Sequence, residues 1–177
     1  TTAGKAYDVV VVCNDDVWHG DLSYAVCDLL EESAPGFTRP QGYFNIVKQV
    51  APAQASDIDR KYPNLLIISI NPTVETYSLS KNIYARPQTI ITLTAPSVAS
   101  AIEFIESATP VIRGEFEKAE RNNSNNFYAK NPAEQLMTDF KEHIGVEMLI
   151  PANFYKATTR DENLLWYIRD FPKRADY

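Results

Sequence analysis

Apolar residues along the chain follow two patterns, one typical of strands and the other typical of helices. Residues 9–13 and 65–70 are almost continuous apolar runs, which predicts strands that are covered on both faces. Residues 88–94 alternate isoleucine and leucine with threonine, and residues 43–50 alternate less strictly, so both segments indicate further strands. Residues 77–85 are predicted to form an irregular or edge strand. The run at 65–70 is expected to lie at the centre of the sheet.

Two helices are predicted between these strands. The first begins near Asp21, because apolar residues recur there at steps of three and four and form one face: Leu22, Ala25, Val26, Leu29 and Leu30. Residues 51–62 predict a second, short helix, in which Ser56 and Asp59 are spaced as a capping pair and Pro63 marks the end.

From Pro96 onward the apolar spacing becomes helical. Pro110 interrupts the stripe and lacks an amide donor, so the sequence predicts either a kink or two abutting helices, the second running toward Tyr128. Residues 122–126 are an asparagine-rich tract with poor helix propensity. That tract predicts fraying or a loop, or alternatively a solvated face of the helix.

A last helix is predicted after residue 131. Asn131 stands at the cap position, Pro132 in the first turn, and Glu134 where it can reach back to the cap amide. Gly145 is expected to end this helix. Residues 146–150 are predicted to form a strand.

The chain closes with a predicted hairpin of residues 154–159 and 164–169, turning at residues 160–163. Strands and helices mix along the chain, with late helices before the hairpin. The fold class expected is therefore α/β or α+β: a two-layer sandwich with a mixed β-sheet and helices packed mainly on one face. We expect one domain over residues 1–177, which can also be the N-terminal part of a longer protein.

Composition and charge narrow the classes of function. The chain is 45% hydrophobic and 11% aromatic, as a globular protein is, and its 17 basic and 23 acidic residues give a net charge of −6. No block of lysine and arginine is long enough to bind nucleic acid, and no apolar run approaches the roughly 20 residues of a membrane helix. The glycines are scattered singly and no Gly-x-Ser-x-Gly motif occurs, so neither a nucleotide cofactor nor a serine hydrolase is expected.

The best candidate site is the polar loop between the first strand and the first helix, where ligands often bind in open α/β sheets. Its candidate ligand-binding residues are Asn14, Asp15, Asp16, Trp18 and His19. Paired carboxylates can hold a divalent cation or supply a base. The favoured alternative is a turn, because Asn and Asp satisfy free backbone amides at helix entries.

Cys13 and Cys27 fall on the first strand and the helix after it. They can form a disulfide if the helix folds back over the strand, but two buried free thiols are the favoured interpretation. The histidines, His19 and His143, show no ligand spacing with the cysteines, so no metal site is expected.

Aromatic side chains offer a second kind of site, since exposed rings stack on sugars or anchor a protein partner. The rings selected for inspection are Trp18, Tyr24, Tyr84, Trp166 and Tyr167. For any one ring, a place in the core or half-buried on the sheet is the favoured interpretation.

Four motifs in their order carry a resemblance to a known family: residues 7–11, 16–18, 82–88 and 150–152. The chain resembles an uncharacterised bacterial family, a domain of unknown function found in envelope lipoproteins of gut anaerobes. The resemblance implies a secreted protein held by an N-terminal lipidated cysteine that this sequence does not contain, and family members that continue beyond residue 177. It implies no activity, cofactor or catalytic residue.

Three hypotheses follow. The first is a non-enzymatic domain of the cell envelope, in the periplasm or anchored at the outer membrane, that binds a protein or glycan through aromatic and acidic patches. The second is a metal-dependent or hydrolytic enzyme centred on Asp15, Asp16 and His19. The third assigns function to a missing part of a larger lipoprotein, with the terminal hairpin awaiting a partner segment. No membrane contact other than the lipid anchor is expected.

Overall fold

The structure, a computed structural model, describes residues 1–36, 38–158 and 164–169. Its contacts divide the chain into two compact units, Thr1–Glu120 (unit 1) and Arg121–Tyr177 (unit 2). Each unit is described by itself.

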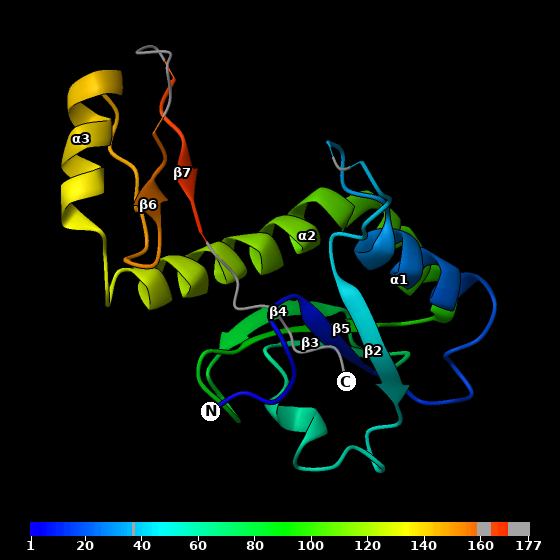
Figure 1. Cartoon of the computed structure of the whole chain (residues 1–177). Coiled ribbons are helices and arrows are strands. Elements are labelled where there is room, and N and C mark those ends of the chain that lie inside the picture. Colours follow the sequence, from blue (N-terminus) through cyan, green and yellow to red (C-terminus); the bar gives the residue numbers. More distant parts are fainter. Residues whose placement is uncertain (37, 159–163, 170–177) are drawn as a thin grey trace, which may run out of the picture. The chain divides into compact units, whose positions relative to one another are not determined.

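Unit 1 is built on a five-stranded sheet, ordered β2-β1-β3-β5-β4 (Figure 1). Its strands are β1 (Asp8–Val12), β2 (Asn45–Val50), β3 (Asn64–Ile70), β4 (Thr76–Lys81) and β5 (Thr89–Ala95). The pairs β2–β1, β1–β3 and β3–β5 are parallel, while β4 pairs with β5 antiparallel at the edge of the sheet. The predicted mixed sheet and the central strand at 65–70 are confirmed. The edge strand predicted over residues 77–85 is confirmed in its first part, because β4 ends at Lys81.

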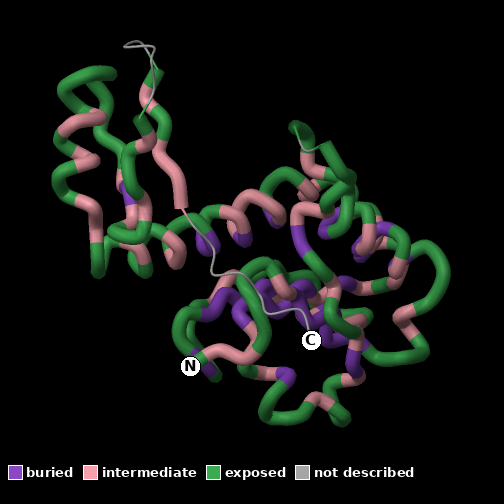
Figure 2. The backbone as a smooth tube through the Cα atoms, viewed as in Figure 1, coloured by how far each residue is buried: buried purple, intermediate pink, exposed green. Residues whose placement is uncertain are grey.

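One face of the sheet is covered by the helix α1 (Asp21–Glu31) and by the part of α2 (Val98–Tyr128) that belongs to unit 1. The predicted apolar face of α1 is buried, and so are Ile105, Ile112 and Phe116 of α2. These side chains join Val9, Val11 and other strand residues in the main core cluster, and Figure 2 shows the buried positions along the strands and on α1 and α2. The two-layer α/β arrangement with helices on one face is confirmed for unit 1.

The opposite face carries a smaller core cluster, which Ala55 and Tyr62 of the β2–β3 connection help to cover. The predicted helix over residues 51–62 is wrong, because only a single 3-10 turn, η1 (Asp59–Lys61), forms there. The expected cap geometry is nevertheless present: Asp59 Oδ2 accepts hydrogen bonds from Ser56 N at 3.0 Å and from Ser56 Oγ at 2.7 Å.

Asp59 is buried and forms an ion pair with Lys48 of β2. Burial acts to raise the pKa of Asp59, but hydrogen bonds from Lys48 and Ser56, together with the charge of Lys48, hold that pKa below its ordinary value. The Ser56–Asp59 pair therefore anchors an irregular connection to the sheet, and no helix is propagated from it.

Helix α2 runs without interruption through Pro110, so the alternative of two abutting helices is wrong. The asparagine-rich tract at 122–126 is helical, with Asn122, Asn125 and Asn126 exposed. The second interpretation of that tract, a solvated helix face, is the one confirmed. From Arg121 onward the helix belongs to unit 2.

Unit 2 contains α3 (Glu134–Ile144), which ends at Gly145 in the left-handed conformation, as predicted. The predicted cap at Asn131 is wrong: Ala133 occupies the cap position and makes no side-chain capping bond. Asn131 lies before the helix, where its carbonyl oxygen accepts a hydrogen bond from Ala152 N at 3.0 Å.

The predicted strand at 146–150 is also wrong, since residues 146–149 make no strand pairing and only an isolated bridge joins Pro132 and Pro151. The terminal hairpin is confirmed by the antiparallel pairing of β6 (Tyr155–Lys156) and β7 (Tyr167–Ile168). Its predicted turn at 160–163 lies outside the described residues.

Asp139 of α3 ties the hairpin to the helix. It accepts hydrogen bonds from Lys156 Nζ at 2.8 Å and from the Tyr167 hydroxyl at 3.2 Å. The hydrogen bond from Lys156 is the main reason that the pKa of Asp139 lies below its ordinary value, and the bond from Tyr167 and the charges of Lys156 and His143 act in the same direction. Burial acts in the opposite direction but does not outweigh them. On the same helix, His143 Nδ1 lies 3.4 Å from Asp139 Oδ1.

Candidate functional site

The candidate loop at residues 14–19 follows the carboxyl end of β1, as predicted. The amides of Val17 and Trp18 donate to the Asn14 carbonyl, each at 3.0 Å, and close a turn before α1. Gln49 of β2 donates through Nε2 to Cys13 O at 2.7 Å and to Asp15 Oδ1 at 3.0 Å. The loop is thus held by backbone bonds and by one neighbouring amide.

The side chains of this loop do not share one environment. Asn14, Asp15, Asp16 and His19 are exposed, whereas Trp18 is partly buried and packs against the main core. Among the described residues, no group of three or more His, Cys, Asp and Glu side chains is arranged to hold a metal ion. The geometry is that of the turn interpretation, and a ligand-binding role for these five residues stays a prediction.

The cysteines are both free thiols, so the disulfide alternative is wrong. Cys13 is buried and Cys27 is only partly buried. Burial, together with the negative charges of Asp16 and Asp15, raises the pKa of the Cys13 thiol to about 11. A thiol in that state is a poor nucleophile at neutral pH, because the thiolate is the reactive form.

The aromatic side chains selected from the sequence are dispersed. Tyr24 on α1, Tyr84 after β4 and Trp166 in unit 2 are exposed, while Trp18 and Tyr167 are partly buried. None of these five lines the groove described next.

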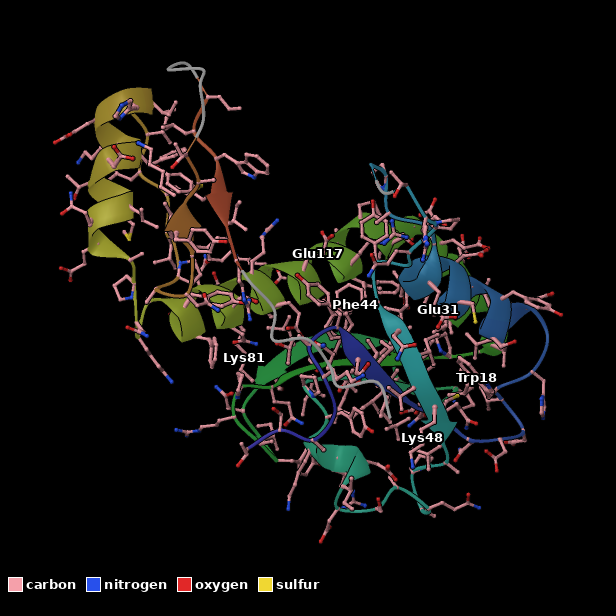
Figure 3. The ribbon with its side chains drawn as sticks, in the orientation of Figure 1. Trp18, Glu31, Phe44, Lys48, Lys81 and Glu117 are labelled. Carbon is pink, nitrogen blue, oxygen red and sulfur yellow. The ribbon has the colours of Figure 1, made fainter. Side chains whose placement is uncertain are left out.

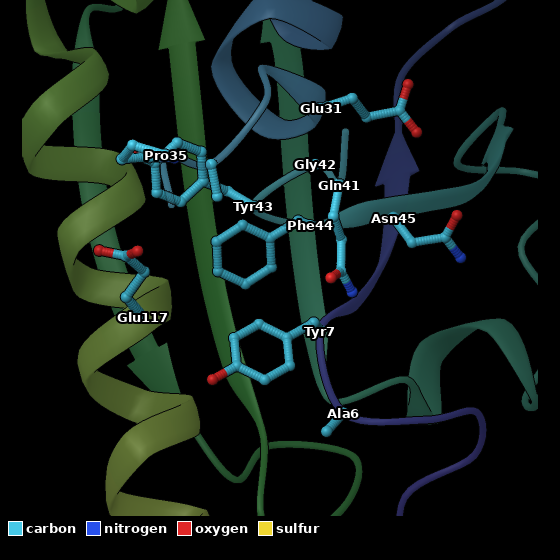
Figure 4. A pocket seen from close by; sticks show the side chains of 11 residues that line it. Ala6, Tyr7, Glu31, Pro35, Gln41, Gly42, Tyr43, Phe44, Asn45 and Glu117 are labelled. Carbon is cyan, nitrogen blue, oxygen red and sulfur yellow. The ribbon is translucent and has the colours of Figure 1, made fainter. Parts of the chain in front are cut away.

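A groove of about 860 Å³ opens in unit 1 at the amino ends of β1 and β2. Five segments that are distant in the sequence contribute to it: residues 6–7, the end of α1, residues 34–35, residues 41–45 and α2 (Figure 4). Its volume lies within the range of roughly 300–1,000 Å³ that small-molecule sites occupy.

Two accessible aromatic rings, Tyr7 and Tyr43, lie in the wall of this groove, and a third lining residue, Phe44, is only 3% exposed. Tyr7 lies against Phe44 with ring centroids 5.5 Å apart, and Phe44 in turn lies 5.7 Å from Phe116 in the core. The Arg113 guanidinium lies over the Tyr43 ring, 4.2 Å from its centroid. The rings are therefore backed by the core and by a cation, which fixes their positions.

Tyr7 has a backbone φ of 65°, in the left-handed region that a bulky side chain rarely adopts. Such a conformation costs on the order of 1–3 kcal/mol and is concentrated at ligand sites and switches. The conformation places the Tyr7 ring beside Phe44, so the strain is located in the wall of the groove (Figure 4).

The polar groups of the groove are two carboxylates, Glu31 and Glu117, and two carboxamides, Gln41 and Asn45. Glu31 Oε1 accepts the Ile46 amide at 3.0 Å, and Asn45 Nδ2 donates to Asp8 Oδ1 at 2.9 Å. The carboxylate of Glu117, which is partly buried on α2, has no hydrogen bond or ion pair with the residues that the structure describes. Figure 3 labels Glu31 on α1, Phe44 immediately before β2 and Glu117 on α2.

Sequence reasoning missed this groove. Each contributor taken alone is ordinary, and the sequence signal that pointed toward it was the Tyr43–Phe44 pair immediately before β2. The groove depends on contacts between residues more than 30 positions apart, such as Tyr7 with Phe44, and no local pattern encodes those contacts.

Fold and groove together define unit 1 as an α/β domain with a mostly parallel sheet and an aromatic, acidic groove at its amino edge. A family model described as Domain of unknown function (DUF8532) matches residues 2–129, and the chain belongs to this family. The match supports the expected likeness to a domain of unknown function. No curated protein and no solved structure matches the chain. No helix in the described part of the chain is long and apolar enough to cross a bilayer.

Proposed function

We propose that this chain is a non-enzymatic domain of the cell envelope, and that the groove of unit 1 binds a glycan. The observation that carries the proposal is the joint lining of one cavity by two accessible tyrosine rings, two carboxylates and two carboxamides. Of the two partner classes predicted from the sequence, protein and glycan, this chemistry favours the glycan.

The rings of Tyr7 and Tyr43 supply the apolar contact that a sugar needs. A sugar ring presents C–H groups on one face and hydroxyl groups at its rim, so it packs flat against an aromatic surface and hydrogen bonds at its edge. Tyr7 and Tyr43 add phenolic hydroxyls, which donate and accept hydrogen bonds.

The polar groups supply the rim contacts. Carboxylates accept hydrogen bonds from hydroxyl groups, and carboxamides both donate and accept them. Glu117 is the strongest candidate, because its carboxylate faces the groove without a partner among the described residues. The strained backbone of Tyr7 supports the same assignment, since strain of this kind is concentrated at ligand sites.

The envelope location, in the periplasm or at an anchored lipoprotein, is supported by the likeness of the sequence motifs to envelope lipoproteins of gut anaerobes. Fractionation of the source cells tests it: the protein is expected with the envelope, and recovery in the cytoplasmic fraction alone would refute that part of the proposal.

The groove is tested by thermal unfolding of the full chain with a panel of neutral, acidic and amino-sugar oligosaccharides. A ligand present at one hundred times its Kd raises the unfolding free energy by about 2.7 kcal/mol, which is roughly 5–10 °C in midpoint for a chain of this size. We expect one chemical class of glycan to produce such a shift.

Two variants assign the shift to the groove. Glu117→Gln removes a charge without breaking a described contact, and Tyr43→Leu removes the flat ring while keeping apolar bulk. Both should reduce the shift, whereas Glu106→Gln, an exposed carboxylate on the same helix, should leave it unchanged. The absence of any glycan shift, or a shift that is equal in all variants, would refute the proposal.

A further inference from the structure

A second surface of unit 1 differs from the groove in its chemistry. The amino end of β5 meets residues 82–88, the turn η1 and the first residues of the chain at one edge of the sheet (Figure 1). We call this surface the basic edge and define it by Lys5, Arg60, Lys61, Lys81 and Arg86, with Ile83 and Tyr84.

Hydrogen bonds bring these segments together. Ala3 N donates to Lys61 O at 2.9 Å, which fixes the first residues beside η1. Gln88 Nε2 donates to Arg60 O at 2.6 Å and to Tyr62 O at 2.8 Å, which joins the β4–β5 loop to the same turn. Lys81 pairs with Thr89 at the end of β4, where Figure 3 labels it.

The β4–β5 loop holds a fixed conformation. Gln88 is buried, its N–H donates to Asn82 Oδ1 at 3.0 Å, and its Oε1 accepts from Tyr84 N at 2.9 Å. Ala85 is buried as well, so the loop is held against the domain at Ala85 in its middle and at Gln88 at its end. Ile83 and Tyr84 are left outward, 60% and 47% exposed.

The basic edge is positive on a chain whose net charge is −6. Its lysines and arginines form no ion pair with the described residues. Of the acidic residues nearby, Asp59 is paired with Lys48, and Asp8 accepts from Lys5 N and Asn45 Nδ2. Glu120 is buried and accepts a hydrogen bond from Asn64, which pairs with Thr89 at the amino end of β5. Asp57 is exposed beside η1.

We propose that the basic edge docks unit 1 onto an anionic lipid bilayer. Exposed isoleucine and tyrosine at a loop tip suit the boundary between headgroups and acyl chains, where tyrosine places its ring in the apolar layer and its hydroxyl in water. Lysine and arginine flanking that tip are attracted to anionic headgroups. A soluble polyanion accounts for the cations but leaves the outward Ile83 without a role.

The inference is independent of the groove, because the two surfaces share no residue. It also goes beyond an N-terminal lipid anchor, since the contact is made by the folded domain. One weak signal seldom gives stable attachment to a membrane, so a second signal from the folded domain would strengthen a lipid tether.

Co-sedimentation of the full chain with large unilamellar vesicles tests the proposal. We expect binding to vesicles of phosphatidylcholine and phosphatidylglycerol, weakening as salt rises, and little binding to phosphatidylcholine alone. Each basic residue near such a surface contributes on the order of fivefold to partitioning. Lys81→Gln/Arg86→Gln should therefore lower it roughly 25-fold.

Matched variants separate the edge from general charge and apolarity. Arg39→Gln/Lys118→Gln removes one exposed lysine and one exposed arginine elsewhere in unit 1 and should bind as the unchanged chain does. Ile83→Ala/Tyr84→Ala should weaken binding, whereas Tyr24→Ala/Val111→Ala, at exposed positions on α1 and α2, should not. Equal thermal midpoints confirm that each variant is folded.

Three results of the vesicle assay would overturn the proposal. They are no binding to anionic vesicles even at low salt, equal binding to neutral and anionic vesicles, and anionic binding that Lys81→Gln/Arg86→Gln leaves unchanged. Binding to heparin without binding to vesicles would also overturn it and would assign the basic edge to a soluble polyanion.

Discussion

Phe116 of α2 is the side chain on which the core and the groove both depend. It is fully buried, lies in the main core cluster, and contacts the Phe44 ring with centroids 5.7 Å apart. Truncating a buried phenylalanine to alanine costs about 3–5 kcal/mol, the sum of lost transfer free energy and the cavity that remains. For a chain of this length, that is a fall in unfolding midpoint of roughly 6–20 °C.

The matched control is Phe127→Ala, on the same helix. Phe127 is 68% exposed, so its truncation should change the free energy of unfolding by less than about 0.5 kcal/mol. The two substitutions delete the same atoms from the same kind of element. Because Phe127 belongs to unit 2, Val111→Ala, at a 59% exposed position of α2 in unit 1, is the control within the unit that contains Phe116.

Urea unfolding followed by tryptophan fluorescence measures both variants. Trp18 packs against the core that contains Phe116, whereas Trp166 is exposed in unit 2, so a Trp166→Phe background leaves one tryptophan reporting on unit 1. Equal losses for Phe116→Ala and Phe127→Ala, or a loss below about 1 kcal/mol for Phe116→Ala, would refute the assignment of Phe116 to the core. A glycan shift that falls together with stability in Phe116→Ala would link the core to the groove through Phe44.

Three further predictions concern single groups. Asp59→Asn should lower the free energy of unfolding by roughly 1–3 kcal/mol at neutral pH. Because the pKa of Asp59 is lowered in the folded state, this difference from the unchanged chain should shrink as pH falls below about 4. Urea unfolding at a series of pH values measures it. The pKa of both thiols is raised, but Cys27 is only partly buried and should react with a thiol reagent in the native state, whereas the buried Cys13 should react only after unfolding, as mass spectrometry of the labelled protein will show. Gly145→Ala should lower the free energy of unfolding by roughly 1–2 kcal/mol, because φ is 77° at this position. Gly114→Ala should raise the free energy of unfolding by about 0.5–1 kcal/mol, because this residue lies within α2 and an added Cβ meets nothing within 4 Å.

Each of these predictions has a result that contradicts it. A difference between Asp59→Asn and the unchanged chain that grows on acidification would reverse the sign derived from the lowered pKa. Native labelling of Cys13 before Cys27 would contradict the burial of Cys13. Equal effects of the two glycine substitutions would show that backbone conformation is not what separates the two positions.

The strands and the first helix were predictable because each is encoded by a local pattern that burial then enforces. The run at 65–70 became the central strand β3, and the apolar face of α1 is buried as its spacing predicts. Segments whose structure depends on distant partners were not predictable. Residues 51–62 carry a correct capping pair, yet the ion pair between Asp59 and Lys48 fixes them as an irregular connection. Residues 146–150 have strand-like composition but no strand pairing at 146–149.

The candidate site shows the same division. The loop at residues 14–19 was found because it follows a strand that local sequence predicts, and ligands in open α/β sheets often bind at that edge. The groove and the basic edge both lie at the other end of the strands, where the amino ends of the parallel strands meet the neighbouring loops. The Tyr7 ring contacts the Phe44 ring because β1 and β2 are neighbouring strands. In the same way, Gln88 donates a hydrogen bond to the Arg60 carbonyl because β3 and β5 are neighbouring strands. The sheet topology, which assembles these pairs, therefore has to be known before either surface can be recognised.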